Sequence, residues 1–288
     1  MQFALLEGCQ IPARLPAYAT ATRQVLASLS VHLVEIEFNC CGYPIRDIDE
    51  EAYLHAAVRN IALAGRRKSD LLTPCQCCFG SLRMADHRMR TDAKTRGRIN
   101  ARLAEEGLQW SGETRIFHLL TLLDRVVGVD RIREQITRPL KGVAVAAHYG
   151  CHALRPATVT HFDHPLHPRI FERLIEATGA RSVSWPKRLE CCGRPLWEKN
   201  RPLSVELTKE KLRDAGTAGA AWICTACTHC QLQFDQVREP ATLGHACPPA
   251  ILYPHLLGLS MGLDPMVLGL DADRVFPPHL DGKPGRKK

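Results

Sequence analysis

The cysteines of this chain form one pattern that occurs twice. Each copy consists of a lone cysteine, a gap of about 30 to 40 residues, a Cys-Cys-Gly triplet, a similar gap and a Cys-x-x-Cys segment. All of the 13 cysteines except Cys247 fall inside these two copies. Two copies in register predict a duplication around two soft-metal sites, because thiolate sulfur is a preferred ligand of soft metals.

Composition and charge exclude several classes of protein. With 288 residues, 45% hydrophobic and 24% charged, the chain is typical of soluble globular proteins. Its most apolar region, 250–270, is interrupted by Pro254 and Asp264, so we expect no membrane span. Aromatic residues do not interleave with the basic residues behind the net charge of +8, so we expect no nucleic-acid binding. The start of the chain lacks a secretory signal pattern, which predicts a cytoplasmic protein whose clustered cysteines bind metal instead of forming disulfides.

Apolar segments recur in the same order in both halves. Short apolar runs, typical of buried parallel strands, occupy 3–6, 31–38, 70–73, 143–146, 182–185 and 220–223. Helical stretches alternate with them at 18–28, 54–61, 168–178 and 205–212. This order predicts an α/β fold of two pseudo-repeated domains, each with a small, mainly parallel sheet and flanking helices.

We place the domain boundary at residue 140. The first domain, 1–140, includes a helical linker of about 84–140, in which 92–106 and 117–127 have helical patterns. The second domain, 141–288, ends in a basic tail. Partner docking is the alternative role for the linker.

The cysteines follow the predicted strands, at the carboxyl ends where functional loops of parallel sheets gather. Helix N-termini begin at the same edge, and their free N–H groups stabilise anions such as thiolates. Gly42 and Gly193 end the two Cys-Cys-Gly triplets, where we expect a positive φ or a close backbone approach.

Sulfur-only ligation leaves two kinds of metal site open. A structural zinc and an ordinary cubane cluster each need four ligands, whereas each half offers five or six cysteines. A zinc site usually has two short Cys-x-x-Cys pairs, which this spacing does not provide. The spacing therefore favours iron–sulfur chemistry, and a zinc-stapled scaffold without a redox role remains the alternative.

Several segments resemble the CCG-domain (cysteine-rich domain) family, and most closely the B subunit of heterodisulfide reductase. The matching segments cover nearly the whole chain and comprise 40–42, 73–82, 147–156, 191–193, 227–235 and 251–258. The resemblance implies two noncubane [4Fe-4S] clusters, each held by five cysteines. Carried over, the first set is Cys9, Cys40, Cys41, Cys75 and Cys78. The second set is Cys151, Cys191, Cys192, Cys227 and Cys230.

One ligand in the second set is open, because Cys224 and Cys230 both form a Cys-x-x-Cys with Cys227. We prefer Cys230, since the residues after it follow the family and since 34 residues then separate Cys192 from Cys227, close to the 33 in the first half. The remaining thiols, Cys77, Cys224 and Cys247, are then expected to be inert, as free cysteines often are in cores.

Fewer signals concern residues other than cysteine. His148 and His152 flank Cys151 and are candidates to donate a hydrogen bond to sulfur or a proton to a leaving thiolate. For His152 a structural histidine is the alternative. Lys209 and Lys211 are expected on a solvated helix face.

No glycine-rich dinucleotide loop is present, so electrons must come from or go to another polypeptide.

The resemblance implies an oxidoreductase acting on sulfur groups within a complex. Its partners would be the ferredoxin-like and the flavin-bearing subunits of a heterodisulfide reductase-like complex. The substrate would be a disulfide or protein-bound sulfur, cleaved or formed between the two clusters. An electron-transfer component of a lactate-, glycolate- or succinate-oxidising complex is the alternative, because such complexes also carry CCG domains.

Overall fold

The computed structural model describes residues 2–238 and 247–270 and contains one parallel sheet in each half. The strands of the first sheet are β1 (Phe3–Leu5), β2 (Leu33–Val34), β3 (Asp70–Thr73) and β4 (Ile116–His118). Those of the second are β5 (Ala144–His148), β6 (Arg181–Val183), β7 (Trp222–Thr225) and β8 (Ala250–Leu252). The basic tail expected at the end of the chain lies outside the described residues.

Both sheets have the same strand order. It is β2-β1-β3-β4 in the first half and β6-β5-β7-β8 in the second, and every pairing is parallel. The first strand of each half therefore lies inside its sheet, between the second and third. This confirms the predicted α/β class and the repeated organisation with parallel sheets.

Helices connect the strands. In the first half they are α1 (Gln10–Arg14), α2 (Pro16–Ser28), η1 (Tyr43–Ile45), α3 (Glu50–Arg66), α4 (Gln76–Thr91), α5 (Ala93–Ala104), α6 (Leu119–Leu122), η2 (Leu123–Gly128) and α7 (Val129–Glu134). In the second half they are α8 (Ala157–Thr160), α9 (Ile170–Ala177), η3 (Pro186–Leu189), η4 (Arg194–Leu196), α10 (Arg201–Thr217), α11 (Thr228–Val237) and α13 (Tyr253–Ser260). None of the described helices is long and apolar enough to span a membrane.

The duplication extends to the helix caps. The Asp49 carboxylate accepts a hydrogen bond from the Ala52 amide (2.9 Å) at the start of α3, and the Asn200 side chain accepts one from the Leu203 amide (3.2 Å) at the start of α10. Both caps satisfy an amide that the helix cannot pair internally. Equivalent caps begin the helix after each Cys-Cys-Gly triplet, so the two triplets are held in the same way.

Three strands differ from the sequence prediction. The strand expected over 31–38 shrinks to the two residues of β2, because this segment pairs only with β1 at the edge of the sheet. The strands β4 and β8 were not predicted. The segment 117–127 was expected to be helical, but its first two residues belong to β4. Three residues carry too little periodicity to be recognised, so pairing with β3 and β7 decides these strands.

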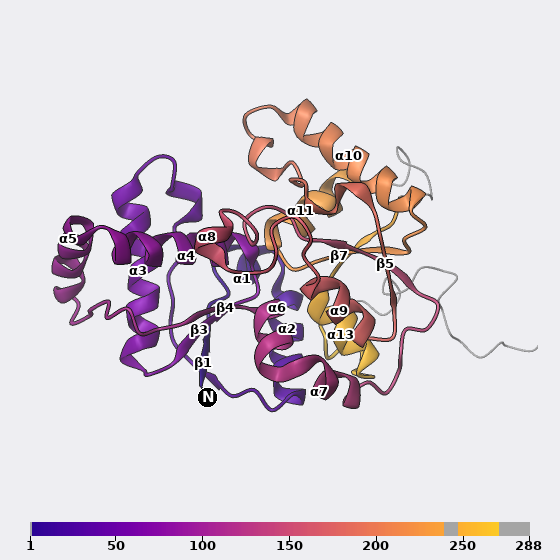
Figure 1. The fold of residues 1–288 in the computed structure, drawn as a ribbon, viewed down its shortest axis with the longest axis horizontal. Helices are drawn as coiled ribbons and strands as arrows, with labels where there is room; N and C mark the ends of the chain where they lie inside the picture. Colours follow the sequence, from indigo (N-terminus) through magenta and orange to yellow (C-terminus); the bar gives the residue numbers. More distant parts are fainter. Residues whose placement is uncertain (1, 239–246, 271–288) are drawn as a thin grey trace, which may run out of the picture.

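The two halves share one continuous core. Helix α13 of the second half packs on α2 of the first, and His255 Nε2 lies 3.1 Å from the Ala17 carbonyl oxygen. Fully buried His118 makes a similar contact, with Nε2 3.1 Å from the Ala226 carbonyl oxygen. Figure 1 shows the first half, indigo to magenta, beside the second, and α4 and α11 contact each other where the halves meet.

Candidate metal centre

Two small cavities at the junction of the halves are lined by many cysteines, which make up about half of the lining residues of each. The cysteines along the first cavity are Cys9, Cys41, Cys75, Cys77 and Cys78. Those along the second are Cys77, Cys151, Cys191, Cys192, Cys227 and Cys230. Cys40 adjoins the first cavity, because its Sγ lies 3.5 Å from Cys9 Sγ. The structure thus brings together all ten cysteines of the two expected sets, five in each half.

Strand ends and helix starts position these side chains. Cys75 follows β3 and caps α4, and Cys227 follows β7 and caps α11. Both cap residues have extended backbone, and neither cap uses its side chain to pair the first helical amides. The start of a helix carries amides without an intrahelical partner and favours negative charge, so Cys75 and Cys227 occupy positions that suit a thiolate.

The glycines of the two triplets have the expected positive φ, +79° at Gly42 and +94° at Gly193. Each also lies close to the next helix. A Cβ built on Gly42 would lie 2.9 Å from the Tyr53 carbonyl oxygen, and one built on Gly193 would lie 2.6 Å from the Ser204 carbonyl oxygen. Only glycine fits both the conformation and the contact.

In each Cys-Cys pair, hydrogen bonds from neighbouring thiols lower the pKa of one cysteine. Hydrogen bonds from the Cys40 and Cys78 thiols lower the pKa of Cys41 to about 5. In the second half, hydrogen bonds from the Cys151 and Cys192 thiols lower the pKa of Cys191 to about 2. The thiolate is the form that binds metal, so each set is prepared for ligation.

The two sets touch each other. The sulfur atoms of Cys75, Cys77 and Cys227 all lie within 4.8 Å of one another. Thr228, from the second half, has its Oγ1 2.9 Å from Cys75 Sγ of the first. Tyr43, Cys77 and His229 line both cavities and therefore form the wall between them. A substrate placed at this wall would meet both sets.

The three cysteines expected to be inert lie in different environments. Cys224 is a fully buried strand residue of β7, paired in register with Ala147 and Ile251, and lines neither cavity. Cys247 is buried and also lies outside both cavities. Cys77 is different, because its Sγ lies 3.7 Å from Cys227 Sγ in the dividing wall.

His152 lies at the same wall. Its Nδ1 is 3.3 Å from Cys151 Sγ and 3.7 Å from Cys77 Sγ, and its ring meets the Tyr43 ring edge-on at 4.9 Å. Burial lowers its pKa, which favours the neutral ring with one donor and one acceptor nitrogen.

Two buried polar residues lie near the second cavity; the burial of Lys211 was not predicted from the sequence, whereas His148 was a candidate hydrogen-bond donor beside Cys151. Lys211, expected on a solvated face, is 1% exposed; its Nζ donates to the Lys187 carbonyl oxygen and lies 5.0 Å from the Trp185 ring centre. Burial lowers its pKa to about 8, so it is mostly charged at neutral pH. His148 is fully buried. Comparing the halves position by position marks both, since their counterparts are Asn60 and Leu6.

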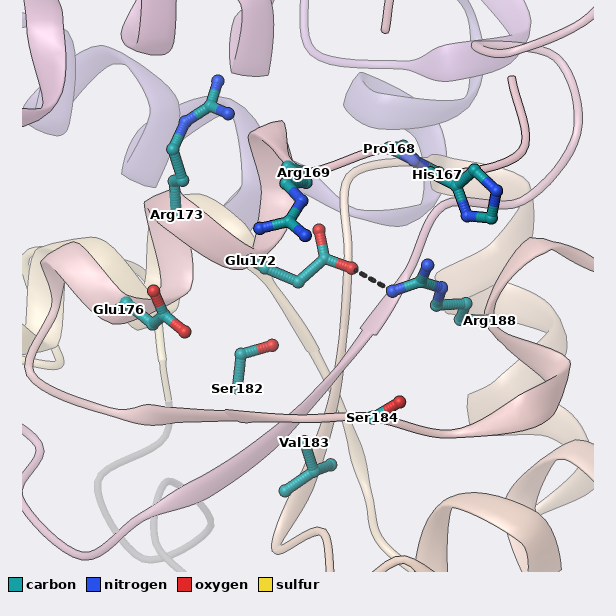
Figure 2. A pocket seen from close by; sticks show the side chains of 10 residues that line it. All are labelled: His167, Pro168, Arg169, Glu172, Arg173, Glu176, Ser182, Val183, Ser184 and Arg188. Carbon is teal, nitrogen blue, oxygen red and sulfur yellow. Dashed lines mark hydrogen bonds and ion pairs between the residues drawn. The ribbon is translucent and has the colours of Figure 1, made fainter. Parts of the chain in front are cut away.

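A larger pocket lies away from the cysteines, between α9 and β6 (Figure 2). Three arginines, Arg169, Arg173 and Arg188, line it, and Arg188 donates to Glu172 at 2.9 Å. No cysteine lines this pocket, so it belongs to a different part of the surface from the metal centre.

Comparison with known proteins agrees with the repeated cysteine pattern. The family described as "Cysteine-rich domain" (CCG) matches residues 3–83 and 145–235, one match in each half. The B subunit of a ferredoxin- and F420H2-dependent CoB-CoM heterodisulfide reductase of Methanosarcina acetivorans is 32% identical over 95% of this chain and 94% of the relative. The B subunit of a ferredoxin:CoB-CoM heterodisulfide reductase of Methanosarcina mazei is 33% identical over the same shares.

The chain is also similar to a subunit of a fumarate reductase and to one solved structure. The "8-methylmenaquinol:fumarate reductase membrane anchor subunit" of Wolinella succinogenes is 30% identical over 94% of this chain and 95% of the relative. A solved structure, a hypothetical protein from Helicobacter pylori, superposes with a TM-score of 0.72 at 14% identity over 94% of this chain. The chain spans about half (51%) of that solved chain, and the likeness shows the fold alone. Together with the two cysteine sets, these matches show that the chain belongs to the cysteine-rich CCG-domain family, among the relatives of the heterodisulfide reductase B subunit.

Proposed function

We propose that this chain is the iron–sulfur subunit of a heterodisulfide reductase-like complex, in which a disulfide or sulfane bond is cleaved or formed between two noncubane [4Fe-4S] clusters. The observation that carries the proposal is the convergence of two five-cysteine sets on adjacent cavities, with sulfur atoms of both sets within 4.8 Å at the shared wall. Relatives of about one-third identity over nearly the full chain are named as the B subunits of heterodisulfide reductases.

The residues present fit such clusters. Ten of the thirteen Cys, His and Glu side chains along the two cavities are thiols, and most of these thiols are buried. Donor sets in which sulfur predominates suit iron–sulfur clusters. When bound there, the clusters would supply one-electron chemistry next to a sulfur substrate.

This chain's own residues would orient the substrate and move protons. Reduction of a disulfide consumes two electrons and two protons and releases two thiols. His152 Nδ1 lies 3.3 Å from Cys151 Sγ in the second set and 3.7 Å from Cys77 Sγ in the wall. After taking up a proton, the ring would pass it to one departing sulfur. Tyr43 would limit access of water by packing its ring on His152 and His229. In the oxidative direction the same groups would accept protons.

Electrons would pass to or from partner subunits, which we propose to be the ferredoxin-like and the flavin-bearing members of the complex. Cys9 is exposed and brings one thiol of the first set to the surface. A partner subunit docked there would exchange electrons with the first cluster. The Wolinella relative, whose name places it in a fumarate reductase, favours a second candidate, in which the chain relays electrons in a dehydrogenase complex without acting on sulfur. Turnover of a disulfide by the assembled complex would distinguish the two.

Metal content tests the central claim. Protein purified under anaerobic conditions should contain about eight iron atoms and as many acid-labile sulfides, because each five-cysteine set would hold one four-iron cluster. Iron, zinc and sulfide assays with a visible absorption spectrum provide the measurement. Stoichiometric zinc without iron or sulfide would instead support the zinc-stapled scaffold.

Ligand choice in the second set has a matched test. Cys230→Ser should lose or convert the second cluster and retain about half of the iron. Cys224→Ser should retain all of it, because Cys224 Sγ is enclosed in the core at β7. Cys77→Ser should also keep its iron, since the second half has His229 at this position. Iron loss from Cys224→Ser with none from Cys230→Ser would reverse the assignment.

A further inference from the structure

The two sulfur sets have unequal surroundings, although the halves are repeats. The fully buried His148 has no hydrogen-bond partner for either ring nitrogen within the described part of the chain. Gln76, 1% exposed, likewise has no partner for its Nε2 among those residues. Buried polar groups without partners are costly, so their presence indicates a ligand that pairs with them.

Both side chains converge beside the second cavity. A Cβ built on Gly150 would lie 2.9 Å from Gln76 Oε1, 3.5 Å from His148 Nε2 and 3.6 Å from Cys230 Sγ. Gln76 belongs to the first half but lines the second cavity. The polar ends of His148 and Gln76 and the Cys230 sulfur therefore all lie around Gly150, the residue before Cys151.

The crossed contact of Gln76 has a counterpart in the other half, and the contact of His148 has none. Thr228, which follows Cys227 as Gln76 follows Cys75, places its hydroxyl 2.9 Å from Cys75 Sγ across the junction. Gln76 and Thr228 thus each reach the cavity of the other half. The position equivalent to His148 is the buried, apolar Leu6, which cannot donate a hydrogen bond to the first set.

A buried charge adds to this difference. Lys211 on α10 is enclosed, and its charge interacts first with Glu190 and then with Cys192, Cys230 and Cys191 of the second set. Its counterpart on α3 is the neutral Asn60, whose Nδ2 donates to the Asn39 carbonyl oxygen at 3.1 Å. A positive charge acts strongly at short range in a buried site and stabilises added negative charge.

We propose that His148 and Lys211 give the second cluster site the higher reduction potential of the two. An electron that reaches the protein would then reduce the second cluster before the first. The proposal rests on the proposed function, since it assumes a cluster in each set. Hydrogen bonds to cluster sulfur and nearby positive charge both stabilise the reduced, more negative form. The first set, which has Leu6 and Asn60 at these positions, lacks both contributions. His148 and Lys211 act as positioning residues, because they set where the electron lies without reacting themselves.

The test is an EPR-monitored redox titration at pH 7 of the anaerobically purified protein, with iron content measured on each sample. Cys192→Ser identifies the signal of the second set by removing it. In the otherwise unchanged protein, we expect the second signal to have the higher midpoint potential. His148→Leu and Lys211→Met should each lower it, with about a tenfold change in the ratio of reduced to oxidised cluster at fixed potential, equivalent to about 59 mV for one electron. The midpoint potential of the first signal should not change.

Two control variants separate this effect from general damage. Lys211→Arg retains the charge and should keep the potential near its original value. Lys209→Met removes a half-buried charge from the same helix and should leave both signals unchanged. Unchanged midpoints in both His148→Leu and Lys211→Met at full iron content would overturn the inference, as would a second signal of lower potential than the first. Absence of any iron–sulfur signal from the unmutated protein would contradict the proposed function itself.

Discussion

Cys41→Ser and Cys192→Ser should each nearly abolish disulfide turnover by the assembled complex, and the double variant should be little worse than either single one. The reason is the shared wall: Tyr43, Cys77 and His229 border both cavities, so a substrate there needs both sulfur sets. Groups that act as one unit have strongly non-additive effects. We expect a loss of about a hundredfold to a thousandfold in kcat/KM for each, the range for removal of one essential stabilising group.

Cys224→Ser is the matched control, because it changes one buried thiol that lines neither cavity. Each variant must be shown to retain its partner subunits and the other cluster before turnover is compared. Substantial turnover by a complex that has lost one cluster would contradict paired action. The chain would then be a one-cluster catalyst with a relay, and the fumarate reductase relative would become the better guide.

Gly193→Ala should destabilise the second half severely and prevent its cluster from assembling. The positive φ of +94° costs an L residue about 1–2 kcal/mol. The added Cβ would also lie 2.6 Å from the Ser204 carbonyl oxygen, a backbone atom that α10 holds in place. Overpacking of this kind costs a further 1–3 kcal/mol, roughly. Thermal unfolding and iron content provide the measurements, and about half of the iron should be lost.

Variants of two other glycines distinguish the cost of backbone strain from the cost of the steric contact. Gly219 has a φ of +77° but no atom within 4 Å of a built Cβ, so Gly219→Ala should cost only the backbone strain, about 1–2 kcal/mol. Gly97 in α5 has neither constraint, so Gly97→Ala should be neutral or stabilising by up to about 1 kcal/mol. Equal effects of Gly193→Ala and Gly219→Ala would show that the close approach to α10 does not matter.

The linker shows why some elements could not be predicted. Its helix α5 agrees with the helical pattern over 92–106 and begins at the Asp92 cap, which accepts a hydrogen bond from the Thr95 amide at 3.0 Å. The helix α4, which runs into the linker from Gln76, was not predicted. β4, in the same linker, depends on pairing with β3, a contact between segments far apart in the chain. Periodicity is a local property, so it predicts α5 and misses the three-residue strand.

The sequence by itself determined the duplication, the parallel α/β class and the two glycines that need positive φ, because each depends on spacing or on local backbone chemistry. Only the tertiary structure decided what surrounds the sulfur atoms. The burial of Lys211 on α10, the burial of His148 at the end of β5 without a hydrogen-bond partner among the described residues, and the contact of Thr228 with Cys75 all arise from tertiary packing. No local pattern marks these side chains, since a lysine or histidine on a helix or strand has the same spacing whether it faces water or a buried cavity.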